Sequence, residues 1–101
     1  MVGGGLSMII CAAIQVTFPR AGKPVEVVIP GWRHSSCWEL MAALGVPAER
    51  EEVEGFIDHN GAFLDRLDAF EHALQCGQLS DTTRTEKASR QERVLFSEDL
   101  Y

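Results

Sequence analysis

The sequence is short of basic residues and has no apolar run long enough to cross a membrane. Its 9 lysines and arginines stand against 15 aspartates and glutamates, so the formal net charge is −6. Duplex DNA and RNA are bound by basic surfaces that replace counterions, which argues against generic duplex binding here. The apolar run from Met8 to Ile14 is too short for a transmembrane helix, and no lysine or arginine precedes it as in a secretory signal. We therefore expect neither duplex nucleic acid nor a membrane as a partner.

Cysteine is also scarce. Cys11, Cys37 and Cys76 are odd in number and far apart, which is not the pattern of a disulfide framework. Reduced thiols are typical of the cytoplasm, where we expect the protein to reside. The 101 residues correspond to a single domain, 1–101, with one modest core. A chain this small exposes much of its surface, so we expect a homo-dimer or a higher homo-oligomer.

The first part of the chain predicts a hairpin followed by a helix. Residues 7–18 and 25–30 have the composition of strands, and the Pro- and Gly-containing segment 19–24 reads as the turn between them. Ser36 and Glu39 have the spacing of a capping box, which places Cys37 in the first turn of a helix. The apolar face of this helix is predicted to consist of Leu40, Met41 and Leu44.

A second hairpin is expected after an acidic surface connection at 48–54. Phe56-Ile57 and Phe63-Leu64 are short apolar runs on either side of Asn60-Gly61. This dipeptide favours tight hairpin turns, because type I′ turns need positive φ at both central positions. Asn60 and Gly61 are therefore predicted at the hairpin tip.

The last third begins with a helix. Asp65 has the character of an N-cap, and the helix is predicted from Arg66 to Cys76. Residues 78–93 are polar and lack an apolar period, which indicates a mobile loop. The buried stripe of the helix at 66–76 is predicted to be Leu67, Phe70 and Leu74. Residues 94–101 have an apolar start that favours an edge strand or packing on a partner.

The order of elements favours an α+β fold. Both strand pairs are hairpins, so the sheet should be small and antiparallel, with the two helices packed on one face.

His34 and Cys37 outline a possible Cys-His nucleophile. A cysteine at a helix N-terminus has a lowered thiol pKa, and a nearby histidine could act as its base. The alternative is that Cys37 is a small core residue, which fits the lack of an identifiable oxyanion or orienting partner. His59, His72 and Cys76 complete no zinc tetrad with them. We expect no catalytic residues, no metal and no cofactor.

Basic residues give the better candidates. Arg33 lies where a strand reaches a helix N-terminus, a place that attracts phosphate, although pairing with a carboxylate would explain it too. The segment 84–93 holds four basic and two acidic residues and could face a phosphate or be a solvated loop. Phe56 either packs in the core or stacks on a base. Arg66 is unfavourable in a first helical turn, and a salt bridge to residues 49–54 would account for it.

Several motifs resemble a family of small phage and bacterial proteins. These are Gly55-Phe56, Phe63-Leu64-Asp65-Arg66, Cys76-Gly77-Gln78 and the terminal Ser97-Glu98-Asp99-Leu100-Tyr101. The likeness covers about residues 31 to 101. It extends to the first-named Thoeris anti-defence proteins of phages. The resemblance implies a protein that sequesters a cyclic ADP-ribose signal in the host cytoplasm without cleaving it, as a dimer or larger assembly.

The resemblance also implies roles for individual residues. Arg33 and a basic residue of 84–93 would hold the phosphates, Phe56 would stack on the base, and Asp65 would read the adenine or ribose edge. Two positions depart from the family: Asp65 stands where many members have Asn, and Ala62 where a basic residue is common. An ionised carboxylate cannot donate to a base nitrogen, so these changes bear on the identity of the ligand. The full set expected to bind a nucleotide is Arg33, His34, Phe56, Asp65, Arg66, Arg84 and Arg93.

Two other functions are compatible with the sequence. A protein–protein interaction module could use Trp32, Trp38 and the C-terminal tail as its surface, and would then expose an apolar patch. A small enzyme could use Cys37, or act on a nucleotide, and would then convert its ligand.

Overall fold

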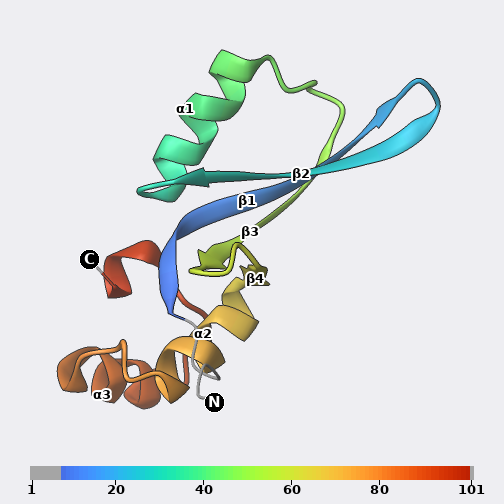
Figure 1. The fold of residues 1–101 in the computed structure, drawn as a ribbon. Coiled ribbons are helices and arrows are strands. Elements are labelled where there is room, and N and C mark those ends of the chain that lie inside the picture. The colour runs from blue at the N-terminus through green and yellow to red at the C-terminus, as the bar shows by residue number, and fades with distance from the viewer. Residues whose placement is uncertain (1–7, 101) are drawn as a thin grey trace.

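The computed structural model describes residues 8–100. Ser7, the first residue of the predicted strand 7–18, and Tyr101, the last residue of the segment 94–101, lie outside the described part. Four antiparallel strands form one open sheet in the order β2-β1-β3-β4 (Figure 1). The predicted α+β class, with a sheet built from two hairpins, is confirmed. The elements in chain order are β1 (Ile9–Arg20), β2 (Lys23–Gly31), α1 (His34–Leu44), β3 (Glu51–Asp58), β4 (Phe63–Asp65), α2 (Arg66–Gln75), α3 (Asp81–Ser89) and the 3₁₀ helix η1 (Ser97–Asp99).

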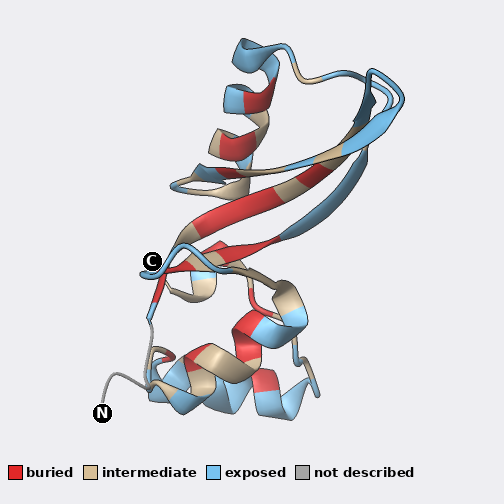
Figure 2. Cartoon of the chain, turned by 45° about the vertical axis from the view of Figure 1, so that its right-hand side comes forward, coloured by how far each residue is buried: buried red, intermediate tan, exposed pale blue. Residues whose placement is uncertain are grey.

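Strand β1 is the centre of the sheet and of the core. It pairs with β2 on one side and β3 on the other. Helix α1 packs over β1 and β2, whereas α2 and α3 gather at the opposite end of the molecule (Figure 1). Figure 2 shows the buried residues concentrated along β1 and where the helices meet the sheet. The core joins Ala12, Ile14 and Val16 of β1 to Cys37 and Met41 of α1, Phe56 of β3, Ala69, Phe70 and Ala73 of α2, and Leu95.

A two-residue turn closes the first hairpin. Ala21 and Gly22 both have positive φ, 52° and 79°, which matches the right-handed twist of the flanking strands. In such a hairpin the flanking pair, Arg20 and Lys23, exchanges hydrogen bonds, and every second pair does the same. The even-numbered residues of β2 therefore direct their backbone groups away from β1. Pro24 and Pro30 are at such positions, where the missing N–H removes no bond from the sheet.

The second hairpin has its tip at Asn60-Gly61, as predicted. Its backbone differs from the expected type I′ turn, because Gly61 has positive φ (82°) while Asn60 does not. The carboxylate of Asp58 holds the turn instead. Its Oδ1 accepts from the backbone N–H groups of Asn60 and Ala62, both at 2.9 Å.

Three predictions near the first helix were wrong. Leu40 and Leu44 of the predicted apolar face are exposed, because α1 buries a face made of Cys37 and Met41. Helix α1 begins at His34 with Arg33 at the N-cap and no side-chain cap, so Ser36 and Glu39 form no capping box. Residues 51–54 are part of strand β3 and not a surface connection. Glutamates are poor strand formers, but the second edge of β1 needs a partner, and pairing with it outweighs local propensity.

The C-terminal third also differs from its prediction. The expected loop at 78–93 contains helix α3, which is capped by Ser80 accepting from the backbone N–H of Thr83. Leu67 is exposed, because α2 buries a face made of Ala69, Phe70 and Ala73. The tail forms η1 and no edge strand. Within residues 8–100 no helix has the length and apolar character needed to cross a bilayer.

Candidate functional site

Three of the predicted site residues meet where α1 and α2 begin beside the interior of β3. His34 Nε2 lies 2.8 Å from the carbonyl oxygen of Gly55, and His34 Nδ1 lies 3.3 Å from Arg66 Nη2. A carbonyl oxygen can only accept, so Nε2 carries the proton and Nδ1 accepts from Arg66. The imidazole also meets the Phe56 ring edge-on, with ring centroids 5.2 Å apart. Burial lowers the pKa of His34, and Arg66 beside it acts in the same direction.

Arg66 connects this junction to the C-terminal segment. It donates to the backbone carbonyl of Leu95 and to the carboxylate of Glu54, each at 2.7 Å. Its guanidinium lies 4.7 Å from the centre of the Phe96 ring. The predicted salt bridge between Arg66 and the 49–54 segment is thus confirmed. Arg66 has a role in packing that explains its place in a first helical turn.

Phe56, Asp65 and Arg33, also predicted to bind a nucleotide, have structural roles. Phe56 is 0% exposed, so its ring is a core side chain and offers no face to a base in this structure. Asp65 caps α2, accepting from the backbone N–H of Asp68 at 2.8 Å. Arg33 lies 3.9 Å from the carboxylate of Glu98 in the tail. The junction is therefore a packed connection between elements.

Arg84 and Arg93 lie away from this junction and line a cavity between α2 and α3. This α2–α3 cavity has a volume of about 340 Å³, and its lining includes Phe70, Leu74, Arg84, Lys87 and Arg93. The guanidinium of Arg93 lies 5.5 Å from the centre of the Phe70 ring. The structure thus brings two of the predicted basic residues together with an aromatic ring. It separates them from Arg33 and His34, which line no part of this cavity.

The cations of the cavity also have carboxylate partners. Arg84 pairs with Asp81 at 2.5 Å, and Arg93 pairs with Glu71. The two arginine side chains are 54% and 63% exposed, so both pairs lie in solvent. Exposed ion pairs contribute about 0–1 kcal/mol and can be exchanged for another anion at little cost.

Lys87 is a residue that the sequence did not single out. Its side chain is 0% exposed, and its ammonium lies 2.6 Å from Glu92 and 2.8 Å from Asp99. It also donates to the carbonyl of Val94 at 2.7 Å. The hydrogen bond from Lys87 lowers the pKa of Glu92. The sequence held one signal for this contact, namely a lysine in the 78–93 segment and an acidic tail that follows it. Asp99 belongs to that tail, in the terminal Ser-Glu-Asp-Leu motif.

The thiol of Cys37 does not meet the requirements of a nucleophile. Burial and the neighbouring Cys11 raise its pKa to about 11, so the thiol stays protonated at neutral pH. Cys37 is fully buried, and both ring nitrogens of His34 are engaged by other groups. Among residues 8–100 no three His, Cys, Asp or Glu side chains are grouped so that they could hold a metal ion.

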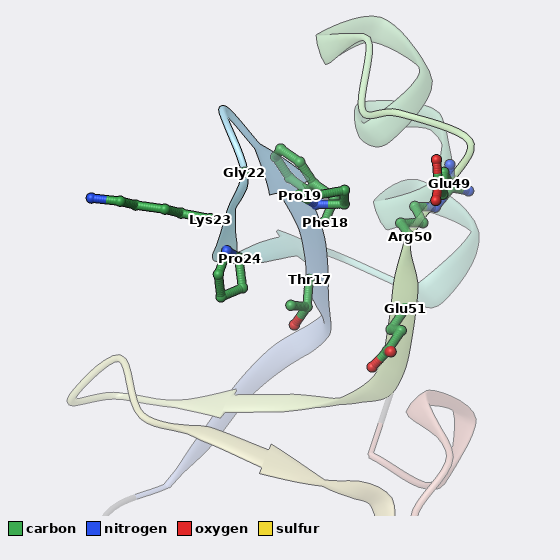
Figure 3. Close-up of a pocket in the computed structure, with 9 residues that line it drawn as sticks. All are labelled: Thr17, Phe18, Pro19, Gly22, Lys23, Pro24, Glu49, Arg50 and Glu51. Atoms are coloured by element: carbon green, nitrogen blue, oxygen red, sulfur yellow. The ribbon is translucent and has the colours of Figure 1, made fainter.

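Other hollows lie near the first hairpin. A pocket of about 400 Å³ is bounded by the hairpin tip on one side and by the start of β3 on the other, with Phe18, Pro24 and Arg50 in its wall (Figure 3). None of the predicted site residues lines it. Of the two tryptophans, Trp32 is 64% exposed and Trp38 is half-buried against the core.

Comparison with known proteins places the chain in a phage family. Its residues 8–101 match the family model described as Phage T4 y16D protein. A search of curated proteins and a search of solved structures found no match. The resemblance to a small phage protein family is therefore confirmed. Since the model covers nearly all of the sequence, the chain belongs to the phage T4 y16D protein family.

Proposed function

We propose that this phage-family protein is an anti-defence protein that binds a cyclic nucleotide immune signal, a cyclic ADP-ribose isomer, and holds it without cleaving it. The α2–α3 cavity is the observation that carries the proposal, because it combines Arg84 and Arg93 with the ring of Phe70. The sequence resemblance to Thoeris anti-defence proteins suggests the class of ligand. The protein would act in the host cytoplasm, as a homo-dimer or larger homo-oligomer.

The charge arrangement is compatible with a diphosphate. Arg84 and Arg93 pair with exposed carboxylates, Asp81 and Glu71, which a phosphate can displace. A guanidinium gives a phosphate two parallel hydrogen bonds, and these charge-assisted bonds are stronger than neutral ones. Two such arginines on one diphosphate would supply the polar part of the binding energy.

The apolar part of the cavity suits a base. Phe70 and Leu74 line the same wall from successive turns of α2. Aromatic rings bind bases by stacking, with about 1–3 kcal/mol per base. In this proposal Phe70 takes the role that the sequence suggested for Phe56, which is 0% exposed. Phe70 is 5% exposed and lines the cavity, so stacking requires the Arg93 guanidinium to move off its ring.

Retention without turnover is part of the proposal. Cys37, the one nucleophile that the sequence suggested, is buried and protonated. The fate of the ligand is therefore the decisive readout. A ligand released unchanged fits a sequestering protein, and a converted ligand would make the protein an enzyme.

The first experiment is thermal melting with a panel of cyclic ADP-ribose isomers and cyclic dinucleotides. A ligand at about 100 times its Kd stabilises the folded state by about 2.7 kcal/mol, which raises the Tm of a domain this size by roughly 10 °C. The ligand is then recovered and analysed by chromatography. We expect one cyclic ADP-ribose isomer to raise the Tm and to be recovered intact. No shift with any compound would overturn the proposal.

Two substitutions locate the site. Arg84→Gln and Arg93→Gln each remove one phosphate contact, and each should weaken binding by about tenfold or more. Arg20→Gln is the matched control, because Arg20 is an exposed arginine at the other end of the molecule. Equal losses in all three variants would indicate attraction by overall charge and no site in the cavity.

A further inference from the structure

Strand β3 is much longer than its outer neighbour. It spans Glu51–Asp58, whereas β4 pairs only with Gly55, Phe56 and Ile57. The chain leaves the sheet at Asp65, where α2 begins. Residues 51–54 of β3 therefore have β1 on one side and no strand on the other, and all four are exposed (Figure 2). We call residues 51–54 the free β3 edge.

The backbone groups on the free β3 edge can be assigned by alternation. The N–H of Asp58 donates to the carbonyl of Ala62 at 3.0 Å, so even-numbered residues of β3 direct their backbone groups outward. Glu52 and Glu54 consequently present two N–H donors and two C=O acceptors on the same side. Within residues 8–100 no other segment pairs with this side of the strand. These four groups, which recur at every second residue, are the hydrogen-bonding positions that an added strand would use.

The other long edge of the sheet is blocked. Outward positions of β2 include Pro24 and Pro30, which have no N–H, so a further strand could not form a full ladder there. Proline is absent from the free β3 edge, and its backbone donors are intact. The protein thus closes one edge chemically and leaves the other able to accept a strand.

The charge of the free β3 edge restricts what can pair with it. Glu51, Glu52 and Glu54 lie along it, and Glu49 and Arg50 precede it. Arg50 pairs with Glu52 and Arg66 pairs with Glu54, each at 2.7 Å, so four carboxylates and two guanidinium groups leave an excess of two negative charges. A second copy of the same edge would place like charges opposite one another, which is destabilising. A strand that carries lysine or arginine would instead form opposite-charge pairs across the ladder.

We propose that the free β3 edge is a docking site for an extended, basic segment of another protein, which adds to the sheet as a strand. Backbone hydrogen bonds to Glu52 and Glu54 would give the affinity, and the carboxylates would select basic side chains. Val53, 44% exposed, would supply an apolar contact on the opposite face. This inference stands apart from the proposed nucleotide binding, because the α2–α3 cavity lies at another place and involves other residues.

The test uses a labelled peptide of alternating lysine and valine, six residues long, with blocked ends. Its binding is measured by fluorescence anisotropy at physiological salt, beside the same peptide carrying N-methyl groups on alternate residues. The methylated peptide keeps the charge but cannot donate to the ladder. We expect the plain peptide to bind and the methylated one to bind at least tenfold more weakly. Equal binding of the two peptides, or no binding of either, would overturn the proposal.

A pair of identical substitutions at the two edges gives the control. Glu52→Pro removes an outward N–H from the free β3 edge and leaves the ladder with β1 intact. Glu26→Pro makes the same change at an outward position of the blocked edge. We expect a loss of at least tenfold in peptide binding for Glu52→Pro and less than twofold for Glu26→Pro. Matching losses would contradict the assignment of the edge.

Amide hydrogen exchange tests the same point without any substitution. In the wild-type protein the amides of Glu52 and Glu54 face solvent, whereas that of Val53 faces β1. Saturating peptide should slow exchange at Glu52 and Glu54 by at least tenfold and change Val53 little. Protection that appears elsewhere and not at these two amides would overturn the proposal, whatever the Glu52→Pro variant does.

Discussion

The ammonium of Lys87 lies 2.8 Å from the carboxylate of Asp99, and no part of the lysine side chain reaches solvent. The same ammonium contacts Glu92 and lies 5.0 Å from the centre of the Phe96 ring. Asp99 in turn accepts from the backbone N–H of Phe96 at 2.8 Å. A single buried cation thus attaches the C-terminal segment to α3.

Replacement of Lys87 by methionine should destabilise the protein strongly. Lys87→Met keeps much of the side-chain length but removes the cation from Asp99 and leaves Glu92 with the more distant Arg90, at 3.7 Å. Removing one partner of a buried ion pair costs about 3–5 kcal/mol. Urea unfolding measures the loss. Arg84→Met, which breaks an exposed pair in the same helix, should cost less than about 1 kcal/mol. Comparable losses in the two variants would show that Lys87 is not held as described.

Gly55 should not tolerate alanine. A Cβ added there would lie 2.1 Å from the carbonyl oxygen of Leu64 and 2.9 Å from Cα of Asp65, both backbone atoms of the neighbouring strand. Strands β3 and β4 would have to separate, and we expect a loss of about 3 kcal/mol or more. Gly61→Ala is the comparison, because a Cβ there meets open space and only the positive φ of 82° is unfavourable, at about 1 kcal/mol. Chemical denaturation of both variants should give this ranking.

Acidification should weaken the fold through His34. Its pKa is lowered from 6.5 by burial in the folded protein, so between the lowered value and 6.5 the unfolded chain binds more protons. This contribution to stability is complete above 6.5 and is lost as the pH falls below it. Urea midpoints from about pH 8 to about pH 5 should therefore fall more for wild type than for His34→Gln. Parallel curves for the two proteins would contradict the prediction.

Cys37 should be the slowest cysteine to alkylate. Its thiol is protonated at about pH 8, because burial raises its pKa to about 11, and alkylating agents react with the thiolate. Cys76 is partly exposed and should be labelled first. Mass spectrometry after timed exposure to iodoacetamide gives the order, and labelling in urea gives the reference rates. Rapid labelling of Cys37 in the native protein would return it to consideration as a reactive group.

Local patterns predicted the elements that depend on neighbouring residues. The first hairpin follows from its flanking valines and isoleucines, the second from Asn60-Gly61, and the start of α2 from Asp65. Each of these signals acts within a few residues of the chain, so it can be read without knowledge of the fold.

Features that depend on distant contacts were not predicted. The strand at 51–54 exists because β1 needs a second partner, and its glutamates alone favour a surface connection. Helix α3 has a single buried residue, Lys87, so its sequence shows no apolar period that would predict a helix. The enclosure of Phe56 and the role of Arg66 follow from the meeting of three elements far apart in sequence. For the candidate site, Arg84 and Arg93 belong to one basic segment of the sequence and line one cavity, whereas Phe70 became prominent only through the packing of α2 on α3.

The central place of β1 has a consequence for how the chain folds during its synthesis. Ile9 lies opposite Asp58 in the sheet, so β1 waits for 49 further residues before its second side is paired. A nascent chain that ends before β3 contains only the first hairpin and α1 of the described elements, and it lacks the strand that pairs with the second side of β1. Contacts this distant in sequence also slow folding, because a long loop must close before they stabilise anything. The first strand of this sheet in chain order is therefore among the last to be fully paired, and one side of β1 stays unpaired until β3 has been made.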